Sequence, residues 1–350
     1  MNLDDPLSFQ QLDRQNMLVE INNLPDQLET AWNKGGNFPL PTWQDIQRVV
    51  IAGMGGSAIS ADLLAAYLQP NCKVPIFTSR DYGLPAWAFG KETLLVASSH
   101  SGNTEETLDA FEVGIQNNCR SIVISTGGQL AARASEVGAP VWLFEHKSQP
   151  RAAVGHSFGL LLALITRLGL TPNPSEEIAS TLLEMRRQQK LVDPQIPASQ
   201  NPAKRLAGQL VGRWVNTIGS GVLAPVARRW KGQINELAKA GAGFDTLPEA
   251  DHNTLAGLSN PEDALNRTVT IFLRADSNHV RNQLRTKLTQ QAFMLAGLNT
   301  NDYSAPGDNP LAQQWSALHF GDYMAYYLAM AYRVDPTPIS AIQEFKQHLE

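Results

Sequence analysis

The chain of 350 residues is long for one domain and comfortable for two, and it can bury a large core without disulfides. Its net charge of −5, with no basic block, argues against binding to a nucleic-acid backbone. The two cysteines form no metal-binding spacing and are too few for a disulfide framework. The longest apolar run, 158–165, is too short to span a membrane, and residues 1–14 lack the pattern of a signal peptide. We therefore expect a soluble cytoplasmic protein with no membrane partner.

The first half of the chain contains short aliphatic runs separated by segments of helical period. Each run is nearly continuous in apolar residues, which is typical of strands covered on both faces. Alternating strands and helices predict an α/β fold with a doubly wound parallel sheet, and residues 3–43 are expected to form helices packed outside it. The predicted strands are 48–53, 74–79, 93–99, 121–126 and 140–145.

A proline-rich segment without periodicity, 193–202, is the predicted linker between two domains, 1–192 and 203–350. A long apolar helix over 152–168 and a polar helix over 175–190 precede it. The second part repeats the alternation more loosely, with predicted strands at 214–218 and 269–274 and helices at 277–295 and 322–332.

The sequence also suggests an internal duplication. Residues 51–57 (IAGMGGS) and 218–221 (IGSG) each place glycines and a serine between a strand and a helix. The low charged fraction, 17% against 43% hydrophobic, indicates surface hidden in a domain or subunit contact.

The first candidate site is the turn at 53–58, where glycines allow backbone amides to approach a ligand at a helix N-terminus. Gly53 and Gly55 could begin a dinucleotide-binding fingerprint, with Ala58 in place of the third glycine. The acidic residue that this fingerprint requires at the end of the second strand is missing, because that strand ends at 78–80 (TSR). A turn that serves only packing is the alternative.

The second candidate site, 98–107 (SSHSGNTEET), is more specific. Hydroxyl side chains, a glycine and a helix start converge there, and no lysine is present as a Walker loop would need. Such a cradle can satisfy the oxygens of a phosphomonoester with hydroxyls and amides while the helix dipole offsets its charge. The alternative is a serine-rich cap with Ser101 or Asn103 at the helix N-cap. Both loops follow strands of one sheet, which favours the phosphate site.

These motifs resemble the sugar isomerase (SIS) domain family, and later segments are similar to its bifunctional phosphoglucose/phosphomannose isomerases. The resemblance extends from about residue 48 onward, with the motifs in order, and His100 stands where many relatives have tyrosine. The similar segments are 55–57 (GGS), 99–107 (SHSGNTEET), 150–153 (PRAA), 233–236 (QINE), 249–253 (EADHN) and 341–346 (AIQEFK).

The resemblance implies two SIS-type, flavodoxin-like subdomains and an aldose–ketose isomerase without a cofactor. It implies a homodimer with shared active sites, a phosphosugar substrate, and interconversion of glucose 6-phosphate and mannose 6-phosphate with fructose 6-phosphate through a cis-enediol. The residues that it places at the substrate are Gly55, Gly56, Ser57, Ser99, Ser101 and Thr104 at the phosphate, and Glu236, His252, Lys346 and Arg151 in catalysis.

Each catalytic role also has an ordinary structural alternative. Glu236 as the base competes with a surface glutamate paired to Lys239 on the same helix. Arg151, at a helix start that disfavours cations, could stabilise an enediolate oxygen or pair with Glu145.

The two remaining catalytic candidates have solvent-exposed alternatives. A loop histidine or a terminal lysine is most often simply solvated. By resemblance, His252 opens the sugar ring from the neighbouring subunit, and Lys346 reaches the ring oxygen, which requires the C-terminal helix to dock.

No histidine spacing indicates a metal site. Three readings compete with this isomerase: a regulatory sugar-phosphate sensor, an isomerase of another phosphosugar, and a nicotinamide dehydrogenase. The sensor would need no catalytic set, and the dehydrogenase rests on Gly53 and Gly55 alone.

Overall fold

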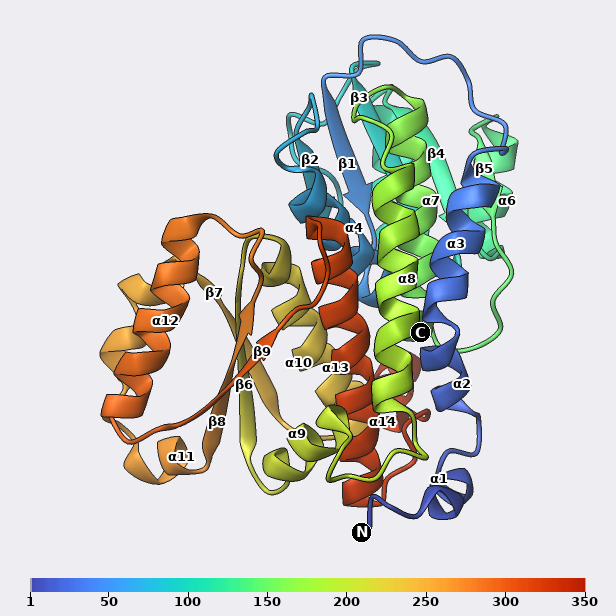
Figure 1. Cartoon of the computed structure of the whole chain (residues 1–350). Coiled ribbons are helices and arrows are strands. Elements are labelled where there is room, and N and C mark those ends of the chain that lie inside the picture. The colour runs from blue at the N-terminus through green and yellow to red at the C-terminus, as the bar shows by residue number, and fades with distance from the viewer. Residues whose placement is uncertain (1, 350) are drawn as a thin grey trace. The chain divides into compact units, whose positions relative to one another are not determined.

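The computed structural model describes residues 2–349, which divide into two compact units. The first unit comprises residues 23–178, and the second comprises residues 2–22 together with 179–349. The linker predicted at 193–202 lies within the second unit, and the domain boundaries drawn from it remain a prediction. Each unit is built around its own parallel sheet (Figure 1).

The first unit contains a five-stranded parallel sheet in the order β2-β1-β3-β4-β5. Every residue of β3 is buried, because helices cover both faces of the sheet. This is the flavodoxin-like strand order, in which ligands bind beyond the carboxyl ends of the strands. The strands are β1 (Arg48–Ala52), β2 (Ile76–Ser79), β3 (Thr93–Ser99), β4 (Arg120–Ser125) and β5 (Val141–Leu143), each within two residues of its predicted ends.

The helices of the first unit pack closely enough to exclude side chains at their crossings. On α7 (Val154–Arg167), a Cβ at Gly155 would lie 3.0 Å from the carbonyl oxygen of Leu24 on α3 (Leu24–Gly35). At Gly159 it would lie 3.0 Å from the carbonyl oxygen of Leu28. Glycine spacing on α7 therefore lets the two backbones meet. The remaining helices are α4 (Gly55–Leu68), α5 (Glu105–Gln116) and α6 (Gly128–Glu136).

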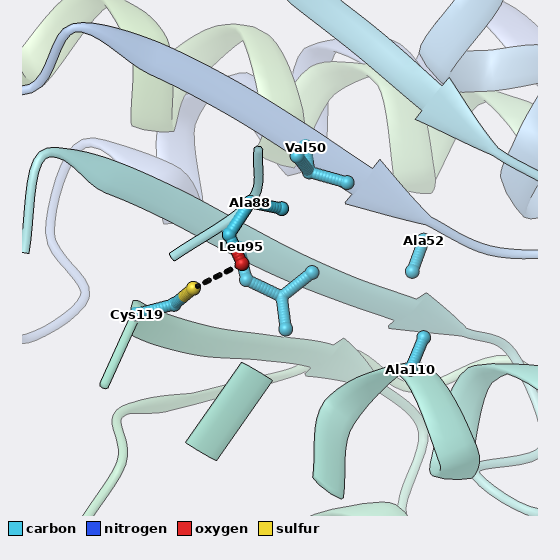
Figure 2. Close-up of a cluster of buried hydrophobic side chains, with 6 residues drawn as sticks. All are labelled: Val50, Ala52, Ala88, Leu95, Ala110 and Cys119. Carbon is cyan, nitrogen blue, oxygen red and sulfur yellow. Dashed lines mark hydrogen bonds between the residues drawn. The ribbon is translucent and has the colours of Figure 1, made fainter. Parts of the chain in front are cut away.

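One part of this core joins strands β1 and β3 to helix α5 (Figure 2). Val50 and Leu95 are register partners and both are fully buried. The thiol of Cys119 points to the carbonyl oxygen of Ala88 at 3.5 Å, and burial raises the pKa of this thiol to about 11. Cys119 therefore acts as a small apolar residue of the core.

The second unit repeats this arrangement with four parallel strands in the order β7-β6-β8-β9. The order matches the first four strands of the other sheet, which supports the predicted duplication. The turn after the first strand matches as well, because Gly55 has φ 51° and Gly221 has φ 52°. The strands are β6 (Trp214–Ser220), β7 (Ala242–Leu247), β8 (Thr268–Arg274) and β9 (Asn299–Ser304), of which β7 and β9 were not predicted.

Helix α13 (Pro310–Tyr332) is the central element of the second unit, with residues 311–330 all buried. A Cβ at Gly321 would lie 2.1 Å from Nε1 of Trp230, so the indole fits only against glycine. That nitrogen donates to the carbonyl of Ala317 at 2.8 Å. The other helices of the second unit are α1 (Pro6–Leu12), α2 (Met17–Asn22), α8 (Ser175–Val192), α9 (Pro202–Leu210), α10 (Ala224–Ala238), α11 (Glu262–Asn266), α12 (Val280–Leu295) and α14 (Ser340–Gln347).

Helix α13 also anchors the N-terminal segment to the second unit. His319 lies with Nε2 2.8 Å from the carbonyl oxygen of Ile21, and burial lowers the pKa of its imidazole to about 4. The imidazole is therefore neutral near pH 7 and donates to that carbonyl. Among the described residues, no helix has the length and apolar character needed to cross a membrane.

A buried ion pair joins α10 to α13. Arg229 donates to both carboxylate oxygens of Asp322, from Nε at 3.2 Å and from a terminal nitrogen at 2.7 Å. Both side chains are only 4% exposed. Asp322→Ala leaves the guanidinium without its carboxylate, and we expect the protein to lose about 3–5 kcal/mol of stability.

Urea denaturation followed by circular dichroism measures this loss. Asp276→Ala, an exposed position, is the control and should change stability by about 0.5 kcal/mol or less. A loss at Asp322 no larger than that of the control would show that the pair does not hold α10 on α13.

Candidate functional site

The two predicted ligand loops meet through their backbones at the carboxyl ends of β1 and β3. A Cβ at Gly53 would lie 2.6 Å from the carbonyl oxygen of Ser98 and 3.1 Å from the Cβ of Ser57. Gly55 adopts a left-handed conformation, which lets the chain turn directly into α4. The Ser57 side chain is buried in the first turn of that helix. Glycine at these positions is thus required by close approach and by φ.

The second loop organises its hydroxyls around one another. Ser99 Oγ lies 2.9 Å from Thr104 Oγ1 and accepts from the backbone nitrogen of Gly102 at 3.1 Å. Ser101 Oγ accepts from the nitrogen of Asn103 at 3.2 Å. The N-cap of α5 is Thr104, and its side chain makes no capping hydrogen bond. The alternative of a serine-rich cap with Ser101 or Asn103 at the N-cap is therefore wrong.

Arg151 joins these loops in the first unit. It lies in a 3-10 turn, η1 (Pro150–Ala153), which precedes the long helix α7. The prediction that Arg151 opens this helix is therefore wrong. A Cβ at Gly56 would lie 2.5 Å from the carbonyl oxygen of Pro150 and 3.3 Å from the Cα of Arg151. Arg151 is only 3% exposed. The structure thus brings the predicted phosphate residues and this buried cation to one end of one sheet.

A cluster of histidines beside the second loop was not predicted. His100 Nε2 lies 2.8 Å from His146 Nδ1, so one ring donates and the other accepts. The His156 ring lies 5.8 Å from that of His146 and stacks on Phe144 at 5.3 Å. These residues come from separate segments after β3, after β5 and in α7, so no spacing in the sequence links them. Among residues 2–349, no three His, Cys, Asp or Glu side chains are grouped to hold a metal ion.

The other predicted catalytic residues lie in the second unit. Glu236 is half-buried on α10, two residues before the helix ends. Lys239, in the left-handed C-cap, donates from Nζ to the main-chain oxygen of Glu236 at 2.5 Å. The backbone of Glu236 thus accepts a hydrogen bond from Lys239.

His252 and Lys346 are both exposed. His252 ends a 3-10 turn, η3 (Glu249–His252), directly after β7. Lys346 lies on α14, where residues 340–347 are all exposed and Ile342 and Phe345 are 42% and 63% accessible. The docking that the role of Lys346 requires is therefore not made in the second unit as described. The role of Lys346 stays a prediction.

A cavity of about 380 Å³ in the second unit contains none of these residues. It is bounded by α8, α9, β9 and α13, with Arg187, Arg205, Tyr303 and Phe320 among its lining residues. Its size is in the usual range for small-molecule pockets. Because the predicted site residues lie elsewhere, this cavity does not bear on their chemistry.

The first-unit loops have the chemistry of an anion site. Backbone amides at the starts of α4 and α5 and the hydroxyls of Ser99, Ser101 and Thr104 supply donors, and the helix dipoles favour negative charge. Ser99 is buried while Ser101 is exposed, so the cradle opens to solvent on one side. Such a site can hold a terminal phosphate and leave the remainder of a ligand free to react.

Comparison with known proteins first defines the class. Residues 199–349 match the model of the bacterial phospho-glucose isomerase C-terminal SIS domain. A hypothetical protein from Thermus thermophilus has a TM-score of 0.75 at 16% identity, covering 98% of this chain and 93% of that chain. A tagatose-6-phosphate ketose/aldose isomerase from Escherichia coli has a TM-score of 0.69 at 16% identity, covering 91% and 93%. The predicted fold class, α/β with two SIS-type subdomains, is confirmed.

Curated relatives narrow the class to one family. A bifunctional phosphoglucose/phosphomannose isomerase from Caldicellulosiruptor bescii is 37% identical over 335 residues, covering 95% of this chain and 98% of the relative. One from Aquifex aeolicus is 30% identical and covers 88% and 94%. The chain belongs to the bifunctional phosphoglucose/phosphomannose isomerase family, which confirms the resemblance seen in the sequence.

The cradle can be tested by removing two of its hydroxyls. Ser101→Ala together with Thr104→Ala should weaken binding of glucose 6-phosphate by about 2–4 kcal/mol, because two hydrogen bonds to a charged group are lost. Isothermal titration calorimetry measures the change. Ser135→Ala, an exposed serine on α6 whose hydroxyl bonds to its own helix, is the control. Unchanged affinity in the double variant would place the phosphate elsewhere.

Proposed function

We propose that this protein interconverts glucose 6-phosphate and mannose 6-phosphate with fructose 6-phosphate. The observation that carries this proposal is the hydroxyl and amide cradle at two helix starts, which suits a phosphomonoester, in a chain of this family. Relatives named for both activities cover nearly the whole chain. A sensor without catalysis would bind the sugar phosphate and leave it unchanged, so one assay separates the two.

The reaction needs one proton carrier and no cofactor. Glu236 takes the proton from C2 of the open-chain aldose, and the electrons of that C–H bond form the C1=C2 double bond of a cis-enediol. The former carbonyl oxygen at C1 gains the negative charge and then a proton. The proton on O1 comes from O2 by way of water, and Glu236 returns the proton that it holds to C1, which gives the ketose.

Arg151 and the phosphate residues would act on charge and position. A guanidinium that is 3% exposed can stabilise an enediolate oxygen more strongly than one in water, because the surrounding dielectric is low. The phosphate held by Ser57, Ser99, Ser101 and Thr104 fixes one end of the substrate. Removal of the C2 proton from either epimer gives the same enediol, but the two protons lie on opposite faces of C2, so one base serves both sugars only if the C2 end of the site lets the enediol rotate.

His252 and Lys346 would serve the ring-opening step that exposes the open-chain aldose. His252 is solvent-exposed on its own subunit, as expected of a residue that acts in a partner's site. Lys346 requires α14 to close, and its exposed Ile342 and Phe345 supply an apolar side for that contact. We therefore propose that His252 is supplied by a second copy of this chain.

We propose that the homodimer contact lies on helix α12, next to the turn that ends at His252. Helix α12 exposes an apolar stripe whose residues are spaced to lie on one face of the helix. The stripe consists of Val280, Leu284, Leu288 and Leu295, which are 68%, 41%, 53% and 80% exposed. The turn that ends at His252 is ion-paired to the same helix. A large exposed apolar patch marks an interaction site, and two-fold dimers are the commonest closed assembly. We place the homodimer contact on this stripe and the enzyme in the cytoplasm.

Glu236→Gln keeps the size and polarity of the side chain but cannot accept a carbon-bound proton. The kcat for glucose 6-phosphate should fall about 10³-fold, while affinity for the phosphosugar is nearly kept. The assay follows fructose 6-phosphate with no cofactor present. A wild-type protein that binds the substrate without converting it would indicate the sensor. Near-normal turnover in the variant would instead move the base to another residue.

Shared sites predict complementation between two inactive variants. Glu236→Ala and His252→Ala homodimers should each be nearly inactive. When equal amounts are unfolded together and refolded, half of the dimers are mixed, and each mixed dimer has one complete site. Activity should recover to about a quarter of wild type for random two-fold pairing. No recovery, with mixed dimers demonstrated by native mass spectrometry, would place His252 in its own subunit's site or outside the reaction.

A further inference from the structure

The turn that carries His252 is held by two residues that directly precede it. Ala250 is fully buried in an apolar cluster with Leu247 of β7 and Phe293 of α12. Asp251, the next residue, is 10% exposed in its side chain, and His252 is exposed. Ala250 thus faces the core, Asp251 is held by polar contacts, and His252 faces solvent.

The polar anchor uses both oxygens of one carboxylate. Asp251 Oδ2 accepts from a terminal nitrogen of Arg285 at 2.7 Å, and Oδ1 accepts from Thr289 Oγ1 at 2.6 Å. Arg285 and Thr289 are four residues apart and therefore lie on one face of α12. We call these three residues the α12 anchor.

The α12 anchor fixes the backbone at His252. The Cα of His252 lies one peptide bond, about 3.8 Å, from that of Asp251. A carboxylate held at two oxygens cannot rotate freely, so the direction in which the chain leaves Asp251 is set by α12. The η3 turn by itself restrains His252 less, because Ala250 is the one buried residue among the four in this turn.

The same helix carries the stripe on which we place the dimer contact. Leu284 and Leu288 each directly precede an anchor residue, Arg285 and Thr289, along α12. The anchor therefore ties the position of His252 to the helix that would meet the partner. A histidine that acts in the site of another subunit must have its orientation fixed relative to the dimer contact.

We propose that Asp251 is a positioning residue for the reaction: through Arg285 and Thr289 it orients His252 toward the active site of the partner subunit. This inference rests on the proposed function and on the sharing of His252. The ordinary alternative is a stabilising ion pair with no part in activity. Because Arg285 is 37% exposed, such a pair would contribute little to stability.

The test uses Asp251→Asn, which keeps the side-chain volume and removes the charge, and Arg285→Met, which removes the donor from α12. Each homodimer should lose about 10²-fold in kcat for glucose 6-phosphate, as expected of a catalytic group displaced by about 1 Å. Arg281→Met, an exposed arginine one turn earlier on α12, is the control and should keep wild-type kcat. Melting temperature and sedimentation show whether each variant is folded and dimeric.

Complementation separates positioning from general damage. A mixed dimer of Asp251→Asn with Glu236→Ala has one site with an intact Glu236 and a correctly anchored His252, so about a quarter of wild-type activity should return. A mixed dimer of Asp251→Asn with His252→Ala has no such site and should stay at the level of its parents. Arg285→Met should behave in the same way in both pairings. A variant that only impaired overall folding would not recover activity with Glu236→Ala while failing to recover it with His252→Ala.

Three outcomes would overturn the proposal. If Asp251→Asn and Arg285→Met keep wild-type kcat, or fail to recover with Glu236→Ala while His252→Ala does recover, the anchor does not position His252 for a partner. If His252→Ala also fails to recover with Glu236→Ala, the sharing of His252 is wrong and this proposal falls with it. In that case, loss of all activity in the Glu236→Gln variant would still support the isomerase assignment.

Discussion

The contact of two backbones at the ends of β1 and β3 is the constraint on which the candidate site depends. Gly53 lies so close to the carbonyl of Ser98 that no side chain fits between the two loops. This contact places the starts of α4 and α5, with their free amides, at one edge of the sheet. Arg151 reaches the same edge because Gly56 leaves room for the 3-10 turn that carries it. A Cβ at Gly53 or Gly56 would disturb the cradle before it altered the core.

The two sheets show what a duplicated frame keeps and what it changes. Both units place a left-handed glycine in the turn after the first strand, at Gly55 and at Gly221. Only the first unit follows its third strand with a loop rich in hydroxyls, whereas β8 ends at Arg274 and leads to α12. The second unit instead contains a half-buried carboxylate on α10 and a histidine next to an aspartate that is bonded to α12. The proposed function therefore assigns phosphate binding and proton transfer to different copies of one strand order.

The sequence predicted the strands whose burial makes them continuous in apolar residues, such as β3, and it missed the two edge strands of the second sheet. β7 (AGFDTL) has only its end residues buried, and every residue of β9 (NTNDYS) is exposed or half-buried, so neither shows an apolar run. The phosphate loop could be predicted because its residues are contiguous. His100, His146 and His156 could not, because tertiary packing alone brings them together. The anchor at Asp251 was missed for the same reason: Arg285 lies 34 residues later in the chain.

In the proposed reaction, one enediol, formed by a carboxylate of this chain, connects one ketose phosphate with two aldose phosphates. Nuclear magnetic resonance of fructose 6-phosphate incubated with the wild-type protein in D₂O, without any cofactor, tests it most directly. The account predicts that glucose 6-phosphate and mannose 6-phosphate both form and that both carry solvent deuterium at C2. Formation of only one epimer, or of products with no deuterium at C2, would contradict it.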